Sequence, residues 1–428
     1  MAEIYRLARP DLYKETLEMA IAIERNSPPV RSGSFGPQWD MGEEEINELI
    51  EVIRSGKLNR LSGTKVLQFE RDFAEMNGVK YAQAVTSGTA AVHTAVGTID
   101  PNPGDEIITT SITDMGTIIG ILYQNAVPVF ADVDPRTGNL DIADVEAKIT
   151  ERTKAIIVVH LFGNPAPMEA YVELARKYDL FLIEDCAQAQ LAEYGGRPVG
   201  TWGDFGCYSF GGKHMTTGDG GMVISNRDDL AERLKWFADK GNPRHPIYEH
   251  YYLAPNYRMT DLQGAVGVAQ LKKVTDAVRR KQWVANHLNE VVDGEAGLSL
   301  QPVLPEATHS YWVYGFHVDA AVMGATAEQF AAALQAEGVP ANSPYMVYPV
   351  YKYPVMAQQR AYGTADFSYA GEKAAAMDYG SMSLPGGESF LETAVVMPMS
   401  PSYTDQDAAD FSTAIKKVGD YYRSKLST

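Results

Sequence analysis

The stretch LFLIEDCAQ, residues 180–188, decides the fold of this chain. A run of apolar residues that ends in an acidic pair is typical of a strand buried in a parallel sheet, whose ligands bind at the carboxyl end. Carboxylates in such a place are costly unless another group pairs with them. Glu184 and Asp185 therefore indicate either a ligand site, such as one for a protonated heterocyclic nitrogen, or a helix cap or ion pair.

Similar apolar segments alternate with helical patterns on both sides of this stretch. This alternation predicts a mostly parallel sheet covered by helices on both faces, with the chemistry in the loops after the strands. The expected strands are 106–111, 127–133, 155–163, 180–186, 206–210 and 221–226, and the helices between them include 90–99, 116–125 and 167–178.

The flanking regions have different patterns. Residues 1–38 are expected to form an attached arm, in which an amphipathic stretch from Leu12 to Ile23 precedes the extended segment SPPVRSGSFGPQW. Helical spacing of Ile46, Leu49, Ile50 and Ile53 predicts a helix over 42–55. The region 227–285 is expected to be mainly helical. Residues 310–319 alternate like an antiparallel strand, while 326–339 and 404–424 are helical, the last capped by Thr404 with Asp407 in its first turn. These patterns divide the chain into 1–38, 39–285 and 286–428.

Composition excludes several classes of protein. The chain has 428 residues and a formal net charge of −18, which argues against binding to nucleic-acid phosphates. Its two cysteines are too few for a disulfide framework. No apolar run approaches the roughly 18 residues of a membrane span, and the charged N-terminal segment lacks a secretory apolar region. We therefore expect a cytoplasmic protein that binds neither nucleic acid nor membrane.

Two glycine-containing motifs complement the acidic strand end. Thr86-Ser87-Gly88-Thr89 opens a helix, where free N–H groups favour an anion, although the same pattern also fits a plain helix cap. Lys213 lies in the glycine-rich loop 209–221 and could be a Schiff-base nucleophile or an ordinary surface lysine. A phosphate cradle, a strand-end carboxylate and a lysine are together the parts of a pyridoxal-phosphate (PLP) site.

On these motifs the sequence resembles the DegT/DnrJ/EryC1/StrS family of PLP-dependent sugar aminotransferases, which have the aspartate aminotransferase fold (fold type I). The resemblance implies an α/β large domain with a mostly parallel seven-stranded sheet and a smaller C-terminal α+β domain. It is strong over 39–285 and weak over 286–428. The motifs that carry it are SGTAA, DEIITTSITD, NAVPVFADVDPRT, VVHLFGNPAPM, IEDCAQAQ, GDFGCYSF with KHMTTGDGGMV, and NYRMTDLQGAVGVAQL.

The resemblance also implies the roles of individual residues. Lys213 would hold PLP as a Schiff base and move the substrate proton, and Asp185 would keep the pyridine nitrogen protonated. Gln188 would touch the ring hydroxyl. Gly88, Thr89 and Ser209 would bind the phosphate, joined by Asn256 from the neighbouring subunit of a homodimer. His160 fits either a catalytic group or a satisfied core histidine, and no metal ligands are expected.

Three departures from the family pattern concern the substrate side. Asp114 stands where an aromatic residue usually stacks on the cofactor ring. We predict that it does not stack but faces the substrate pocket or pairs with a cation or hydroxyl, leaving Met115 or Ile112 against the ring. The stretch from Ser209 to Lys213 is one residue shorter than usual, and Gln190 replaces a frequent histidine.

The activity implied by the resemblance is transfer of an amino group from L-glutamate or L-glutamine to a ketone. The acceptor would be a keto sugar, usually nucleotide-linked, or a keto-cyclitol, which the GPQW segment of the arm favours. The dehydratase branch replaces the lysine by histidine, so Lys213 favours transamination although His214 follows it. A PLP-binding regulator without catalysis is the remaining alternative.

Overall fold

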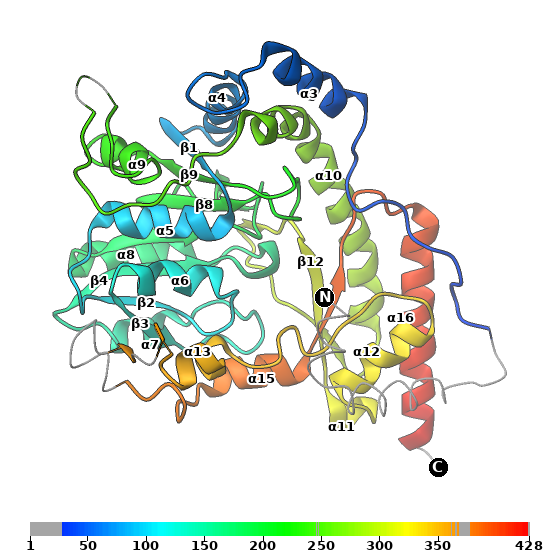
Figure 1. Ribbon diagram of the computed structural model, residues 1–428. Helices are drawn as coiled ribbons and strands as arrows, with labels where there is room; N and C mark the ends of the chain where they lie inside the picture. Colours follow the sequence, from blue (N-terminus) through cyan, green and yellow to red (C-terminus); the bar gives the residue numbers. More distant parts are fainter. Residues whose placement is uncertain are drawn as a thin grey trace.

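The large sheet has the predicted α/β architecture. The structure is a computed structural model that describes residues 28–244, 246, 248–360, 362–363, 366–367 and 377–426, so the helix expected between Leu12 and Ile23 lies outside the described residues. Seven strands follow the order β1-β9-β8-β5-β4-β2-β3, and only β9 runs antiparallel to its neighbours (Figure 1). The strands are β1 Tyr81–Val85, β2 Glu106–Thr110, β3 Val127–Ala131, β4 Thr153–Val159, β5 Phe181–Asp185, β8 Phe205–Ser209 and β9 Gly221–Ser225.

Both faces of this sheet are buried, which explains why its strands are continuous apolar runs. Ile156 and Val158 of β4 join the core formed with α4, α8 and α10, whereas Ala155 and Ile157 point to the opposite core with α5. The helices of this domain are α3 Glu43–Ser55, α4 Lys65–Asn77, α5 Gly88–Ile99, α6 Gly116–Tyr123, α7 Ile142–Ala147, α8 Met168–Tyr178, α9 Ala231–Phe237 and α10 Asp261–Gly294. The region 227–285, expected to be mainly helical, has irregular chain between α9 and α10.

A single long helix connects the two domains. The helix α10 continues to Gly294, so the boundary expected after residue 285 falls inside it. Its second half packs against β12, α12 and α16 in a separate core, and Figure 1 shows this smaller domain beside the large sheet. Its elements are β10 Leu298–Leu300, β12 Val313–Val318, α11 Ala320–Met323, α12 Ala327–Ala336, β13 Ala394–Pro398 and α16 Asp405–Leu426. Thr404 and Asp407 cap α16 as predicted.

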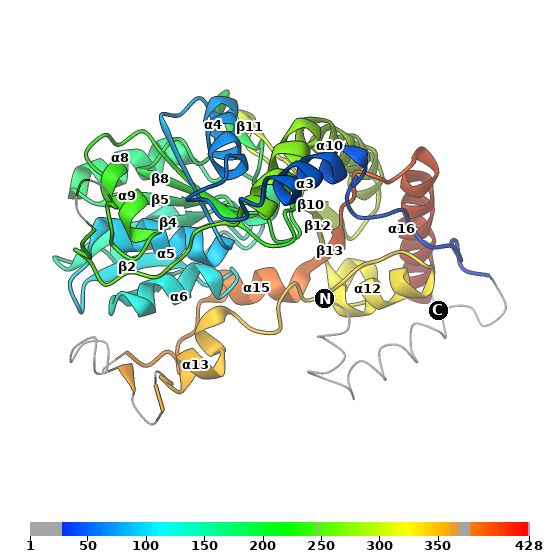
Figure 2. The ribbon, with the colours of Figure 1, turned by 45° about the horizontal axis from the view of Figure 1, so that its top comes forward.

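The tract before β13 returns to the large domain. It contains the 3-10 turn η2 (Val350–Lys352), α13 (Pro354–Ala357) and α15 (Pro385–Thr393), which lie below the sheet in Figure 2. Tyr351 and Phe390 enter one core with Phe130 of β3. A further small sheet, β11-β6-β7, pairs Ala307–Thr308 with Glu193–Tyr194, and β7 is Arg197–Pro198. The two domains are therefore joined by packing as well as by α10.

The surface of α3 differs from the expectation for a helix that packs on its own domain. The helix is present as predicted, but its apolar residues Ile46, Ile50 and Ile53 are exposed by 48%, 38% and 61%. Before it, the end of the arm lies on the small domain, where the ring of Phe35 packs edge-on against that of Tyr403. None of the helices in the described residues has the length and apolarity that a membrane span needs.

Candidate active site

The predicted strand-end carboxylate is buried and held by two donors. Asp185, the last residue of β5, is 5% exposed. It accepts hydrogen bonds from the Thr117 hydroxyl at 2.8 Å and from the Ala187 N–H at 3.0 Å. Burial raises the pKa of this carboxyl, while the two donors and then the charge of Lys213 act in the opposite direction. Asp185 therefore has a fixed orientation and its charge is only partly compensated by the protein, which suits a protonated ring nitrogen.

Lys213 lies in the loop between β8 and β9, enclosed by two tryptophans. Its Nζ is 3.7 Å from the centroid of the Trp312 ring. The Trp39 indole donates to the Lys213 carbonyl and the Trp312 indole to the Gly212 carbonyl, each at 3.4 Å. Burial lowers the pKa of the lysine, and the charges of Asp114 and Asp185 oppose this effect. Lowering the pKa increases the neutral fraction of the amine, which is the form that reacts with a carbonyl.

The first turn of α5 and the end of β8 lie close together, as the predicted phosphate cradle requires. The first N–H groups of α5, at Gly88 and Thr89, have no intrahelical acceptor and carry the positive end of the helix dipole. A Cβ added at Gly88 would lie 2.7 Å from the Ser209 Cβ, so only glycine permits this approach. The Ser87 side chain already caps the helix by accepting from Ala90 N–H. The site thus offers N–H groups and the Ser209 hydroxyl to one anion.

Gln188 is oriented from both sides of the domain junction. Its Oε1 accepts from the Phe162 N–H at 2.8 Å, and its Nε2 donates to the Tyr345 hydroxyl at 3.2 Å. Phe162 has φ of 63°, a conformation that is strained for an aromatic residue. The observed partner of the Gln188 amide is therefore a tyrosine of the small domain.

Asp114 lies at the surface beside the lysine. It is exposed, and its Oδ1 accepts from the Gly116 N–H at 2.7 Å at the start of α6. Its charge raises the pKa of Lys213 and also contributes to the raised pKa values of Tyr345 and Tyr353. These groups therefore share one region of space. The carboxylate accepts a hydrogen bond at the start of α6 and acts electrostatically on Lys213, while its position relative to the cofactor ring stays a prediction.

The two residues expected to replace Asp114 at the ring differ in their surroundings. Ile112 is fully buried in the core at the domain junction, while Met115 is half-buried and packs against that core. The Trp312 ring lies beside the Lys213 amine, with its centroid 3.7 Å from Nζ. Trp312 is thus a further aromatic residue of the site.

The second carboxylate of the acidic pair has a structural role. Glu184 is fully buried and accepts from the backbone N–H groups of Gly200, Trp202 and Gly203 at 2.6–2.8 Å. His160 adds a contact of 3.1 Å through Nε2, and its Nδ1 accepts from the Ala166 N–H. His160 is therefore a satisfied core histidine.

This carboxylate, His160 and Cys186 also form the one cluster in the described chain with the spacing of metal ligands. The hydrogen bonds of Glu184 and His160 already use the ligand atoms of those two residues. Burial raises the pKa of the Cys186 thiol well above its usual value, which keeps it protonated. The cluster is explained by hydrogen bonding within the core.

Three other residues singled out in the sequence have definite places. Asn256 is exposed and pairs with Asp239 in an isolated bridge, and its side chain accepts from the Arg258 N–H. Within the described chain no contact joins it to Lys213 or Asp185. His214 is buried and bonds to the Ser310 carbonyl at 3.0 Å. Gln190 donates to the Ser209 carbonyl at 3.0 Å, next to the phosphate cradle.

Sequence reasoning missed Thr117, Trp312, Tyr345 and Trp39. Thr117 had a local signal, since it is a hydroxyl residue in the first turn of the helix that follows β2. The other three reach the site from the small domain or the arm, so no spacing in the sequence relates them to Lys213. Their contacts depend on how the domains pack.

A half-buried lysine near a strand-end carboxylate, on a mostly parallel sheet, fits the Schiff-base lysine and the pyridinium partner of a PLP-dependent enzyme. Residues 39–416 match the DegT/DnrJ/EryC1/StrS aminotransferase family, and the chain belongs to that family. It is an aminotransferase whose cofactor is pyridoxal 5'-phosphate.

Individual relatives agree with this assignment. The chain is 39% identical over 63% of its length to GDP-perosamine synthase of Escherichia coli O157:H7, covering 73% of that protein. It is 37% identical over 61% of its length to a putative L-glutamine:3-amino-2,3-dideoxy-scyllo-inosose aminotransferase of Micromonospora echinospora, covering 64% of it. The X-ray structure of the aminotransferase from Psychrobacter cryohalolentis superimposes with a TM-score of 0.81 and 29% identity, over 91% of this chain and 100% of that one.

Proposed function

We propose that this enzyme transfers an amino group from L-glutamate or L-glutamine to the ketone of a keto sugar, most simply a nucleotide-linked one, or of a keto-cyclitol. The observation that carries the proposal is the exposed carboxylate of Asp114 beside the half-buried Lys213. An exposed acceptor of hydrogen bonds next to the reacting amine suits a polyhydroxylated substrate. The names of the relatives support both acceptor classes.

The roles of the residues follow from their surroundings. When bound, the cofactor supplies an electron sink for the carbanion formed at the donor's Cα. Asp185 would hold the ring nitrogen in its protonated form, since it is a fixed and buried carboxylate. Gly88, Thr89 and Ser209 would hold the phosphate, and Gln188 would contact the ring hydroxyl. Lys213, whose pKa is lowered by burial, would accept the Cα proton of the donor and deliver it to C4′ of the cofactor.

A half-reaction tests the acceptor class. The enzyme is loaded with pyridoxamine phosphate, and nucleotide-linked keto sugars and inososes are screened for return of the absorbance of the lysine-bound cofactor. Lys213→Ala is the negative control, and borohydride should fix the cofactor to the Lys213 peptide alone. If glutamate reacts but no acceptor in either class does, the keto-sugar and keto-cyclitol assignment fails. If neither half-reaction occurs, the regulator alternative replaces it.

We propose further that the active unit is a homodimer with Asn256 reaching the phosphate of the other subunit. Two apolar surfaces support a second copy. One is the exposed isoleucine stripe of α3, and the other includes Leu253, exposed by 99%, close to Asn256 in the sequence. Exposed apolar residues that gather in this way are typical of interfaces.

Subunit mixing tests the shared site. Lys213→Ala and Asn256→Ala chains, each severely impaired alone, should regain part of the activity when mixed, because one site of the mixed dimer has both native residues. Subunit exchange is verified with differently tagged chains. Exchange without recovery would show that Asn256 serves its own subunit.

A further inference from the structure

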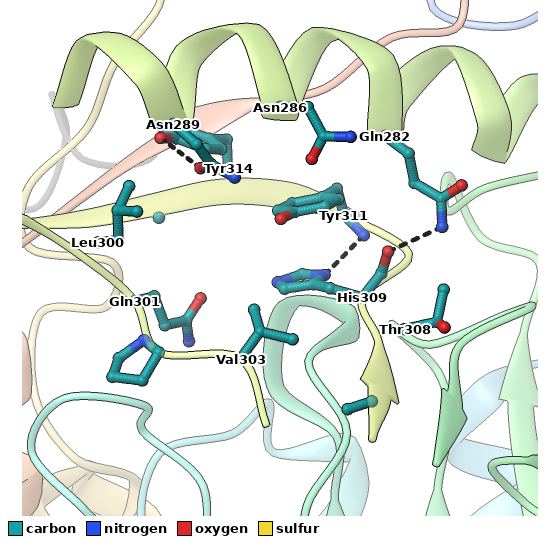
Figure 3. Close-up of a pocket in the computed structure, with 13 residues that line it drawn as sticks. Gln282, Asn286, Asn289, Leu300, Gln301, Val303, Thr308, His309, Tyr311 and Tyr314 are labelled. Carbon is teal, nitrogen blue, oxygen red and sulfur yellow. Dashed lines mark hydrogen bonds between the residues drawn. The ribbon is translucent and has the colours of Figure 1, made fainter. Parts of the chain in front are cut away.

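A cavity lies between α10 and the start of β12, and Lys213 is not among the residues that line it. Its volume is about 610 Å³, within the usual range for small-molecule sites. Figure 3 shows the stacked rings of His309 and Tyr311 in its centre, 3.8 Å apart and nearly parallel. None of the residues proposed to bind the cofactor lines it. The thirteen lining residues are Gln282, Asn286, Asn289, Leu300, Gln301, Pro302, Val303, Ala307, Thr308, His309, Tyr311, Tyr314 and Gly315.

Two buried polar atoms in this cavity have no partner within the described chain. His309 uses Nδ1 to accept from the Tyr311 N–H at 2.8 Å, so its ring proton belongs on Nε2, which is unpaired. Gln301 donates through Nε2 to the Thr137 carbonyl at 2.6 Å and leaves Oε1 unpaired. The two side chains are only 4% and 7% exposed. Leaving such groups unsatisfied is unfavourable, so the site favours a ligand that pairs with both.

The unpaired atoms are one donor and one acceptor. Figure 3 shows the ring of His309 and the amide of Gln301 turned toward the same space. A hydroxyl group can accept from the histidine and donate to the amide at the same time, which neither a carboxylate nor an ammonium group can do. This pair therefore selects a hydroxylated ligand.

The rest of the lining mixes amide and hydroxyl side chains with apolar residues and carries no formal charge. Burial lowers the pKa of His309 to about 3 and raises that of Tyr311. Asn286 and Asn289 lie on one face of α10, three residues apart, with Asn286 exposed at the mouth and Asn289 accepting from the Tyr314 hydroxyl at 3.0 Å. An ionic ligand would find no counter-charge here, whereas amides and a hydroxyl match a ring that bears several hydroxyl groups.

We propose that this cavity binds a neutral polyhydroxylated ring, the chemistry shared by monosaccharides and cyclitols, at a site separate from the one where transamination occurs. One turn of the chain connects this cavity to the catalytic lysine. Tyr311, at φ of 52°, faces the cavity, while the next residue, Trp312, lies against the Lys213 amine. The cavity thus adjoins the segment that packs on the lysine.

Calorimetric titration of the holoenzyme with methyl β-D-glucopyranoside and with myo-inositol tests the proposal. Neither probe has a ketone, so neither can be aminated. We expect saturable binding of at least one, weakened about tenfold or more by Gln301→Leu and by Asn286→Leu. Glu290→Leu, an exposed change outside the cavity on the same helix, should bind as the native protein does. The donor half-reaction should stay near native in Asn286→Leu.

Three results would overturn the proposal. The first is no saturable binding of either probe by the native protein. The second is binding that survives both cavity substitutions but is lost in Asp114→Ala, which would place the ring in the active site. The third is equally tight binding of glucose 6-phosphate, which would contradict selection for a neutral ligand. Because Asn286 is exposed, its variant keeps the test valid if Gln301→Leu fails to fold.

Discussion

The two faces of β5 carry neighbouring carboxylates with opposite purposes. On the face that packs with α4, α8 and α10, Glu184 accepts three backbone N–H groups and a histidine, so its hydrogen-bonding capacity is taken up by the protein. On the face toward α5 and α6, Asp185 has two donors and acts electrostatically on Lys213. The comparison separates a carboxylate whose hydrogen bonds are all made within the protein from one whose charge is compensated only in part, and the second, Asp185, is the one predicted to be catalytic.

The largest expected effect concerns Asp185, on the face of β5 that points toward α5 and α6. Asp185→Asn should slow the glutamate half-reaction by about 10³-fold or more, equivalent to about 4 kcal/mol in the barrier, because an amide cannot keep the pyridine nitrogen protonated. Single-turnover absorbance measures the rate, and cofactor content should remain high because the phosphate cradle is untouched. Asp114→Asn is the matched control and should leave this donor step near native. Native rates in Asp185→Asn would place the nitrogen's partner elsewhere.

The next largest effect concerns Glu184, on the face of β5 that packs with α4, α8 and α10. Glu184→Gln should lower the free energy of unfolding by about 3 kcal/mol, because an amide offers one acceptor oxygen where two now serve buried donors. Denaturant titration measures it, with the exposed Glu173→Gln as control. The folded fraction should retain more of its turnover than Asp185→Asn does. A catalytic loss equal to that of Asp185→Asn would remove the distinction between the faces.

A buried lysine for which the described chain offers no carboxylate acceptor extends the comparison. Lys281 of α10 is 1% exposed, and burial followed by the charge of Lys213 lowers its pKa from 10.5 to about 7. Between these values the unfolded chain binds a proton that the folded chain does not. Stability therefore rises with pH through this window, by up to about 1.4 kcal/mol per pH unit.

Lys281→Met should remove this dependence. We expect it to increase the free energy of unfolding, by about 2 kcal/mol more at pH 6.5 than at pH 9, since the native lysine is most costly where it must be charged in both states. Urea titrations at the two pH values measure the effect, and the exposed Lys272→Met on the same helix is the control. A gain that does not change with pH would mean that Lys281 finds a charge partner.

The smallest effect concerns Asp114, the exposed carboxylate near Lys213. Asp114→Ala should raise the KM of the acceptor about tenfold, near 1.4 kcal/mol, and that of the donor much less, because a hydrogen bond to an acceptor hydroxyl is lost. Steady-state kinetics with both substrates varied measure this. Asp114→Asn keeps the acceptor for the Gly116 N–H, so it separates charge from helix capping. Weaker cofactor retention with unchanged acceptor kinetics would place Asp114 in the cofactor site instead.

The sequence by itself determined the large domain and the parts of its site that follow strands. Continuous apolar runs such as 180–186 can be buried only in a sheet covered on both faces, and the carboxyl ends of parallel strands meet at one edge. For that reason Asp185, the Gly88 turn and Ser209 could be placed near one another without coordinates. The exposure of the α3 isoleucines could not be predicted in this way, because helical spacing shows that a face is apolar but not what covers it.

Only the tertiary structure decided which member of the acidic pair is structural and what surrounds the lysine. Adjacent residues of a strand point to opposite faces, so Glu184 and Asp185 look alike in sequence while one meets the 200–203 turn and the other meets α6. Trp39 and Trp312 reach the lysine loop from the arm and the small domain, and the His309 cavity forms between α10 and β12. The physical reason is that contacts between segments far apart in the chain depend on domain packing, which local patterns of hydrophobicity and charge do not encode.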